Sequence, residues 1–292
     1  MQQLKLIATT QKEARPLLEE NMFAFFEVNI LSLIYGINCM NKLNYYLDSL
    51  IFEIRYASGH LYFDRCGQCL LDIERNCDGW IVSQVDVQSG RLENVERSFT
   101  VNFNNTNYNF SARKPDEDNI ADIAKEISKL WKIIQANLGL DDLLRVGCRL
   151  VYLLPTMSIE ESERRLGRSD YNIRTPEAIT ELGFMIKTRD LTTVFFMGDD
   201  EYRVRQYAGT RYEAVDPSSL LKTEPRFLSK NQNRYRIEKI KKLAQYSANP
   251  MYGVFLDIDC SRAHPEIISF EEYIVEQYIA SKKIFLPMLD KI

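Results

Sequence analysis

A long amphipathic segment that leads directly into an apolar, alternating segment constrains the fold of this chain more than any other feature. Residues 118–138 carry apolar side chains at helical spacing, with charged residues between them. The predicted buried stripe consists of Ile120, Ile123, Ile127, Leu130, Ile134 and Leu138. Gly139 follows where a helix C-cap belongs, and residues 145–154 have the pattern of a strand. The two segments together predict a helix that packs on a sheet.

A weaker copy of the same arrangement lies near the end of the chain, where a basic helical segment at 235–246 precedes a predicted strand at 252–260. The repetition predicts an α+β fold with two similar halves, each a mainly antiparallel sheet packed by one long helix. We place the first half at residues 40–156, the second half at 178–292, and a helical N-terminal extension at 1–39.

The N-terminal extension contains an apolar run at residues 22–40 that approaches the length of a membrane span. Glu27 lies inside this run, so we expect a docked helix and no membrane contact. Met40 is an alternative natural start of the chain. The sequence shows no signal-peptide pattern, and its six cysteines do not form a disulfide framework at this length, so we expect a cytoplasmic protein.

Further elements follow from local patterns. Alternating or apolar runs predict strands at 50–56, 80–88, 99–103, 108–112, 183–188, 191–197 and 202–207. Helical spacing predicts helices at 64–76, 158–165 and 270–285. Ser158 and Ser269 each precede a glutamate by three residues, which is the spacing of a capping box. Pro155 and Pro287 are expected to end the segments before them.

Charge limits the partners that the whole protein can bind. The formal net charge of −4 argues against nucleic-acid binding by the whole surface, although a local basic face stays open. Residues 222–242 supply such a face, with eight Lys or Arg, and Tyr235 and Tyr246 lie within and just after this stretch. The candidate nucleic-acid contacts are Arg234, Arg236, Lys239, Lys241 and Lys242. We favour the simpler interpretation that this stretch is a solvated helix face.

Cysteine chemistry has three interpretations. Cys66 and Cys69 form a C-x-x-C motif, whose spacing suits a redox pair at the start of a helix. With Cys77 and His60 they could instead hold zinc, although this spacing matches no familiar zinc motif. We favour the third interpretation, in which the thiols are small apolar groups on the buried side of a helix.

Paired charges on two predicted strands provide the other candidate site. Asp257 and Asp259 lie two residues apart, so both project from one face and could hold Mg²⁺, although no third acidic ligand is evident. We favour the interpretation that they form the polar side of a half-buried strand. Arg145 and Arg149 also share a strand face. We hypothesise that Arg149 pairs with Asp257 or Asp259 where the two halves meet.

The segments at 50–56 with Glu53 and Arg55, at 145–152, and at 256–259 resemble a sporadically distributed bacterial family without an established activity. The resemblance covers roughly residues 50–290 and implies a two-half α+β architecture with internal duplication. It implies no functional residue, and residues 1–39 fall outside it.

No P-loop, dinucleotide-binding, HExxH or GxSxG motif occurs in the chain. Enzymatic activity stays open, but the sequence favours a non-catalytic interaction or regulatory protein with a protein partner and no cofactor. A homo-oligomer is a further option. The alternative function is a nucleic-acid-associated protein, including a divalent-metal phosphoryl-transfer enzyme that would use Asp257 and Asp259 as catalytic ligands.

Overall fold

A computed structural model describes the protein over residues 45–85, 87, 89–168, 190–211, 237, 250–266 and 269–291. These residues confirm the α+β class, because helices accompany a nine-stranded antiparallel sheet. The strands are β1 (Tyr46–Tyr56), β2 (Ile81–Val85), β3 (Gly90–Asn94), β4 (Phe99–Phe103), β5 (Asn107–Arg113), β6 (Leu143–Thr156), β7 (Asp190–Met197), β8 (Asp200–Arg211) and β9 (Met251–Ala263). The helices are α2 (Tyr62–Asn76), α3 (Ile120–Leu138), α4 (Ile159–Arg168) and α8 (Phe270–Ala280).

One continuous sheet contains strands from both predicted halves. Its order is β2-β3-β4-β5-β1-β6-β9-β8-β7, so β1, β6 and β9 occupy the middle. The central β6–β9 pair runs from Arg145 opposite Ala263 to Thr156 opposite Tyr252. The second predicted long helix, at 235–246, lies outside the described residues apart from Ile237. The internal duplication therefore stays a prediction.

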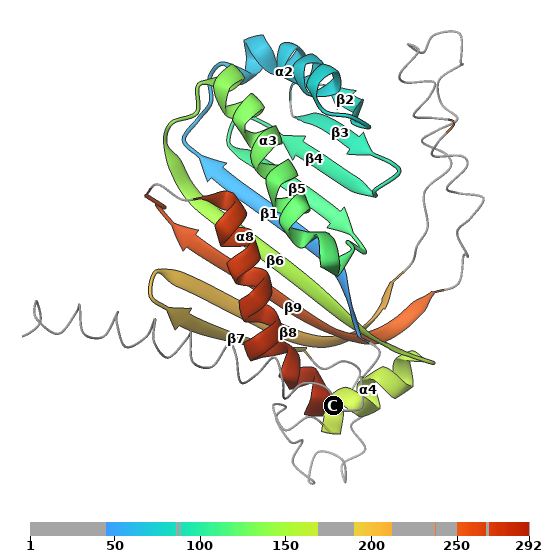
Figure 1. Ribbon diagram of the computed structural model, residues 1–292. Helices are drawn as coiled ribbons and strands as arrows, with labels where there is room; N and C mark the ends of the chain where they lie inside the picture. The colour runs from blue at the N-terminus through green and yellow to red at the C-terminus, as the bar shows by residue number, and fades with distance from the viewer. Residues whose placement is uncertain are drawn as a thin grey trace, which may run out of the picture. The chain divides into compact units, whose positions relative to one another are not determined.

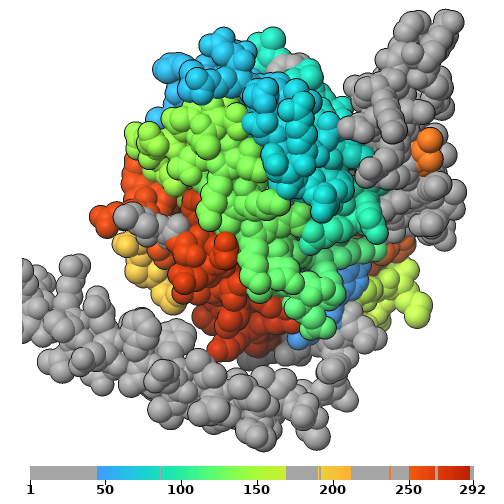
Figure 2. All heavy atoms as spheres, turned by 45° about the horizontal axis from the view of Figure 1, so that its top comes forward, coloured from blue at the N-terminus to red at the C-terminus, as the bar shows by residue number. Residues whose placement is uncertain are grey.

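Helices α2, α3 and α8 lie side by side on one face of the sheet (Figures 1 and 2). An aromatic cluster joins them to the strands. The ring of Trp131 on α3 lies 5.8 Å from that of Tyr56, 5.6 Å from that of Tyr108 and 6.1 Å from that of Phe270. The ring of Phe52 on β1 lies 5.5 Å from that of Phe270. These contacts identify the side of β1 and β5 that faces the helices.

Helix α3 has the predicted stripe and the predicted end. All six apolar residues of the stripe are buried. A short 3₁₀ turn, η2 (Glu117–Asn119), precedes the helix, and the Asp116 side chain accepts a hydrogen bond from the backbone N–H of Asp118. Gly139 takes the left-handed conformation at φ +62°, and its N–H bonds the carbonyl of Gln135. A residue without Cβ meets no steric penalty there.

Several elements differ from the prediction, and three of these differences have a clear physical basis. Strand β3 was not predicted, because Leu92 is the one large apolar residue on its helix-facing side. Pro155 lies inside β6, where β1 has already ended opposite Leu153. Its missing N–H therefore costs no bond to β1. The last helix changes at Ser281 to a π segment, η4 (Ser281–Phe285), and then to a 3₁₀ segment, η5 (Leu286–Lys291), which contains Pro287.

The predicted extension at 1–39 and its apolar run lie outside the described residues, as do the predicted strand at 183–188 and residues 169–177 of the segment between the two predicted halves. Among the helices that the structure describes, none has the length and apolar character needed to span a membrane.

Candidate functional site

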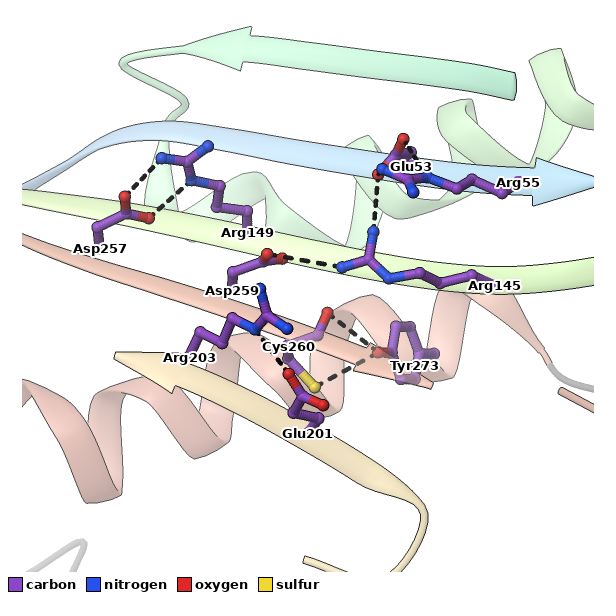
Figure 3. Close-up of polar contacts among 10 residues, drawn as sticks. All are labelled: Glu53, Arg55, Arg145, Arg149, Glu201, Arg203, Asp257, Asp259, Cys260 and Tyr273. Atoms are coloured by element: carbon purple, nitrogen blue, oxygen red, sulfur yellow. Dashed lines mark hydrogen bonds and ion pairs between the residues drawn. The ribbon is translucent and has the colours of Figure 1, made fainter. Parts of the chain in front are cut away.

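The two sides of the central strands differ in chemistry. Phe52 and Tyr108 contact the helices, and the residues in register with them on β6 are apolar and buried. Side chains alternate along a strand, so their neighbours point to the opposite side. We call that opposite side the polar face and define it by Glu53, Arg55, Arg145, Gly147, Arg149, Glu201, Arg203, Asp257, Asp259 and Ser261. Eight of these ten residues, all but Gly147 and Ser261, are drawn in Figure 3.

The polar face contains an open cavity of about 810 Å³, which we call the polar cavity. Strands β5, β1, β6, β9, β8 and β7 all contribute to its lining. Gly147 and Ser261 lie opposite each other in register within that lining. A Cβ on Gly147 would lie 3.5 Å from the carbonyl oxygen of Cys260 and 3.6 Å from Nη2 of Arg145, which are ordinary contact distances. The small residues keep this part of the cavity open.

Arg149 and Asp257 form a two-pronged ion pair (Figure 3). Nε of Arg149 lies 2.7 Å from Oδ1 of Asp257, and Nη2 lies 2.5 Å from Oδ2. In the strand register Arg149 stands opposite Asp259, so the pair is diagonal. The Asp257 side chain is almost fully buried, whereas Arg149 is partly exposed. Of the two aspartates that our hypothesis left open as partners of Arg149, Asp257 is the one in direct contact with it.

Arg145 connects two further carboxylates. Its Nη1 donates a 2.9 Å hydrogen bond to Oε2 of Glu53, and its Nη2 lies 3.6 Å from Oδ2 of Asp259. Nε of Arg55 also donates to Glu53, at 2.9 Å. On β8, Nε of Arg203 donates to Oε1 of Glu201 at 2.6 Å. The carboxylates on this part of the sheet therefore act mainly as acceptors for arginine.

Burial and charge affect the ionisable groups in different ways. The hydrogen bond to Asp257 is the main reason that the pKa of Arg149 is raised. Hydrogen bonds to Glu53 and Glu201 likewise raise the pKa of Arg55 and of Arg203. Burial raises the pKa of Asp259, and the positive charges of Arg145 and Arg149 only partly oppose it.

The predicted metal chemistry finds little support in these contacts. Asp257 and Asp259 do project from one face, but arginine side chains occupy the space beside both. Among the described residues, no group of three or more His, Cys, Asp or Glu side chains is arranged to hold a metal ion. His264, the histidine near this strand, is exposed and lies beyond the end of β9.

The cysteines predicted as redox or zinc residues lie in the core. Cys66, Cys69 and Cys77 are buried, and His60 is exposed. Helix α2 begins at Tyr62, so Cys66 lies in its second turn and not at the N-terminus that a redox motif needs. A Cβ on Gly90 would lie 2.8 Å from Sγ of Cys66, which shows how closely that thiol packs on β3. Burial raises the pKa of the Cys69 and Cys77 thiols.

The candidate nucleic-acid residues of the basic stretch, Arg234, Arg236, Lys239, Lys241 and Lys242, lie outside the described residues. Sequence reasoning missed Glu53, Arg55, Glu201 and Arg203 as parts of a site. Part of the signal was available, because Glu53 and Arg55 stand two apart on a predicted strand, whereas Glu201 precedes the strand predicted at 202–207 that contains Arg203. Residues at that spacing share a face, where they can pair.

No family model, curated protein or solved structure matches this chain. The predicted membership of a bacterial family therefore stays a prediction. The polar face is the feature on which a function can be based.

Proposed function

We propose that this protein is a non-catalytic interaction protein that docks a partner protein on its polar face. The polar cavity carries this proposal, because it spans six strands and its arginines are held in place by carboxylates. Rigid strands present these groups in fixed positions, which lowers the entropy lost on binding. Fixed charges of both signs favour a specific orientation of the partner over high intrinsic affinity.

The contacts of the acidic side chains support binding over catalysis. A catalytic acid or base needs a proton that it can exchange with a substrate. Glu53, Glu201 and Asp257 each accept a short hydrogen bond from an arginine, so these carboxylate oxygens are already used within the protein. The buried thiols of α2 have raised pKa values and are poor nucleophiles.

The alternative function, nucleic-acid association with or without phosphoryl transfer, depends on the basic stretch at 222–242 together with Asp257 and Asp259. The position of Asp257 beside Arg149 weakens its metal-binding part. The remaining part, nucleic-acid association through the basic stretch, would be tested by measuring whether the full chain binds an oligonucleotide.

A pair of matched glycine variants tests the proposal. Gly147→Phe should fill the polar cavity without disturbing the sheet, because a Cβ there meets only ordinary contacts. Gly67→Phe is the control, since Gly67 lies on an exposed side of α2 and a Cβ there meets nothing within 4 Å. Each tagged variant would be used to capture partners from the source cell, with thermal unfolding as the check of folding.

We expect the wild-type chain and Gly67→Phe to retain the same partner protein, and Gly147→Phe to retain about tenfold less or worse, because a buried clash removes more than 1.4 kcal/mol of binding free energy. Equal retention by a folded Gly147→Phe variant would show that the polar cavity is not the docking surface.

A further inference from the structure

Three arginines of the polar face are more exposed than the carboxylates that hold them, whereas Arg145, at 26%, lies between its acceptors Glu53 at 22% and Asp259 at 35%. Arg203 and Arg55 have 63% and 56% of their side chains exposed, whereas their acceptors Glu201 and Glu53 have 31% and 22%. For Arg149 and Asp257 the values are 44% and 5%. In these three pairs the carboxylate lies nearer the sheet, and the guanidinium group is the outer partner.

The carboxylates also fix the direction of these guanidinium groups. The described bonds of Arg203 use its Nε, so its two terminal amino groups are available to a ligand (Figure 3). A guanidinium group can donate two parallel hydrogen bonds to a carboxylate. An arginine that is already held in place loses less rotamer freedom when it binds.

We propose that the polar cavity takes an acidic segment of the partner protein, an inference that rests on the proposed function. In the register, Arg149 on β6 and Arg203 on β8 flank Asp259 on β9. Their backbones therefore lie about 10 Å apart, twice the spacing of neighbouring strands. Two carboxylates of one peptide segment can reach across that distance.

The mixture of charges favours a protein over a nucleic acid. Glu53, Glu201, Asp259 and the exposed Asp199 also line the polar cavity. The phosphate backbone of an oligodeoxynucleotide has no hydrogen-bond donor to offer these carboxylates. A peptide segment can place amide or lysine donors beside them. Phe196, with 75% of its side chain exposed, lies in the same lining and offers a contact for an apolar residue.

The test measures fluorescence anisotropy of labelled oligoglutamate, oligolysine and oligothymidine with the full chain at several salt concentrations. Oligoglutamate should bind most tightly, and its affinity should fall as salt rises. The Arg203→Glu variant should weaken this binding about fivefold, the effect of roughly one lost exposed ion pair. Arg75→Glu is the matched control, because Arg75 is exposed on α2, on the helix side of the sheet. The Arg75→Glu variant should bind oligoglutamate as tightly as the wild type does.

Tighter binding of oligothymidine than of oligoglutamate would overturn the inference in favour of a nucleic acid. The inference would also be overturned if oligoglutamate did not bind, or if Arg203→Glu and Arg75→Glu lowered the affinity for oligoglutamate equally. If any of these results occurred while Gly147→Phe still abolished partner capture, the inference of an acidic partner segment would be wrong, and the proposal that the polar cavity is the docking surface would stand. If Gly147→Phe retained the partner as well, both would be wrong.

Discussion

Asp257 and Asp259 share one side of β9 but have different surroundings. Asp257 is almost fully buried and accepts two hydrogen bonds from Arg149. Asp259 lies 3.6 Å from Nη2 of Arg145, and burial raises its pKa, so folding disfavours its charged form. The same residue type therefore has a charged hydrogen-bond partner at one position, whereas at the other position burial disfavours its charge.

We expect Asp257→Asn to lower the free energy of unfolding by roughly 1–3 kcal/mol at neutral pH, because Arg149 loses a charged partner. Asp259→Asn should change it by less than about 0.5 kcal/mol, or raise it slightly, because the charge that it removes is disfavoured. Denaturant unfolding of both variants measures the difference. Equal destabilisation by the two substitutions would contradict this account.

Glu117 joins β1 to the end of the chain. Its carboxylate lies 2.5 Å from Nζ of Lys282, accepts a 2.8 Å hydrogen bond from the hydroxyl of Tyr278, and accepts a 3.1 Å bond from the N–H of Leu47. Burial alone would raise the pKa of Glu117, but these three donors outweigh burial, and the pKa is lowered.

A lowered pKa gives Glu117 a pH-dependent effect on stability. Its stabilisation is complete above the pKa of an unfolded glutamate, about 4.3, and is lost as pH falls through the lower pKa of the folded state. We therefore expect Glu117→Gln to lower the free energy of unfolding by roughly 1–3 kcal/mol at pH 7 and by much less at low pH. Unfolding measured at several pH values checks this, and a deficit that does not change with pH would count against it.

At the level of helices and strands, two glycines differ in whether their surroundings leave room for a side chain. Gly67 lies in the exposed part of α2, and a Cβ there would meet nothing within 4 Å, so a side chain only reduces the freedom of the unfolded chain. Gly253 in β9 stands opposite Pro155 of β6, and a Cβ there would overlap Cδ1 of Leu153 and lie 2.6 Å from the carbonyl oxygen of Leu154.

Gly67→Ala should raise the free energy of unfolding by about 0.5–1 kcal/mol, the difference in helix propensity. Gly253→Ala should lower it by about 2 kcal/mol or more, because backbone must move to make room. Thermal unfolding of the two variants measures both effects. If Gly253→Ala left the free energy of unfolding unchanged, β6 and β9 would be less closely paired than described.

Elements with a clear periodicity could be predicted from the sequence. The strand at 50–56 and the helix at 118–138 have strong patterns, and both occur: the helix has nearly the predicted bounds, and the strand ends as predicted but begins four residues earlier, at Tyr46. β3 could not be predicted, because Gly90 and Asn94 share its helix-facing side with Leu92 and leave no alternation of apolar residues. Its place in the sheet depends on pairing with β4, which is a tertiary effect.

At the scale of the whole molecule, the polar cavity could be predicted only in part. Periodicity placed Arg149, Asp257 and Asp259 on strand faces, and the expected equivalence of the two halves suggested that Arg149 meets one of the two aspartates. The register of β6 against β9 decides which carboxylate Arg149 reaches, and that register depends on the packing of the other side against the helices. The curvature that hollows the polar face is a property of the assembled sheet.

Photo-crosslinking in the source cell tests most directly whether the polar face is the docking surface. A benzophenone amino acid would replace Phe196 in the lining of the polar cavity or, as a matched control, Phe63 on α2. Both side chains are well exposed, at 75% and 62%, so access to the probe is similar. We expect a discrete crosslinked partner protein from position 196 and none from position 63. The same crosslinks from both positions, or a partner trapped from position 63 alone, would contradict the account.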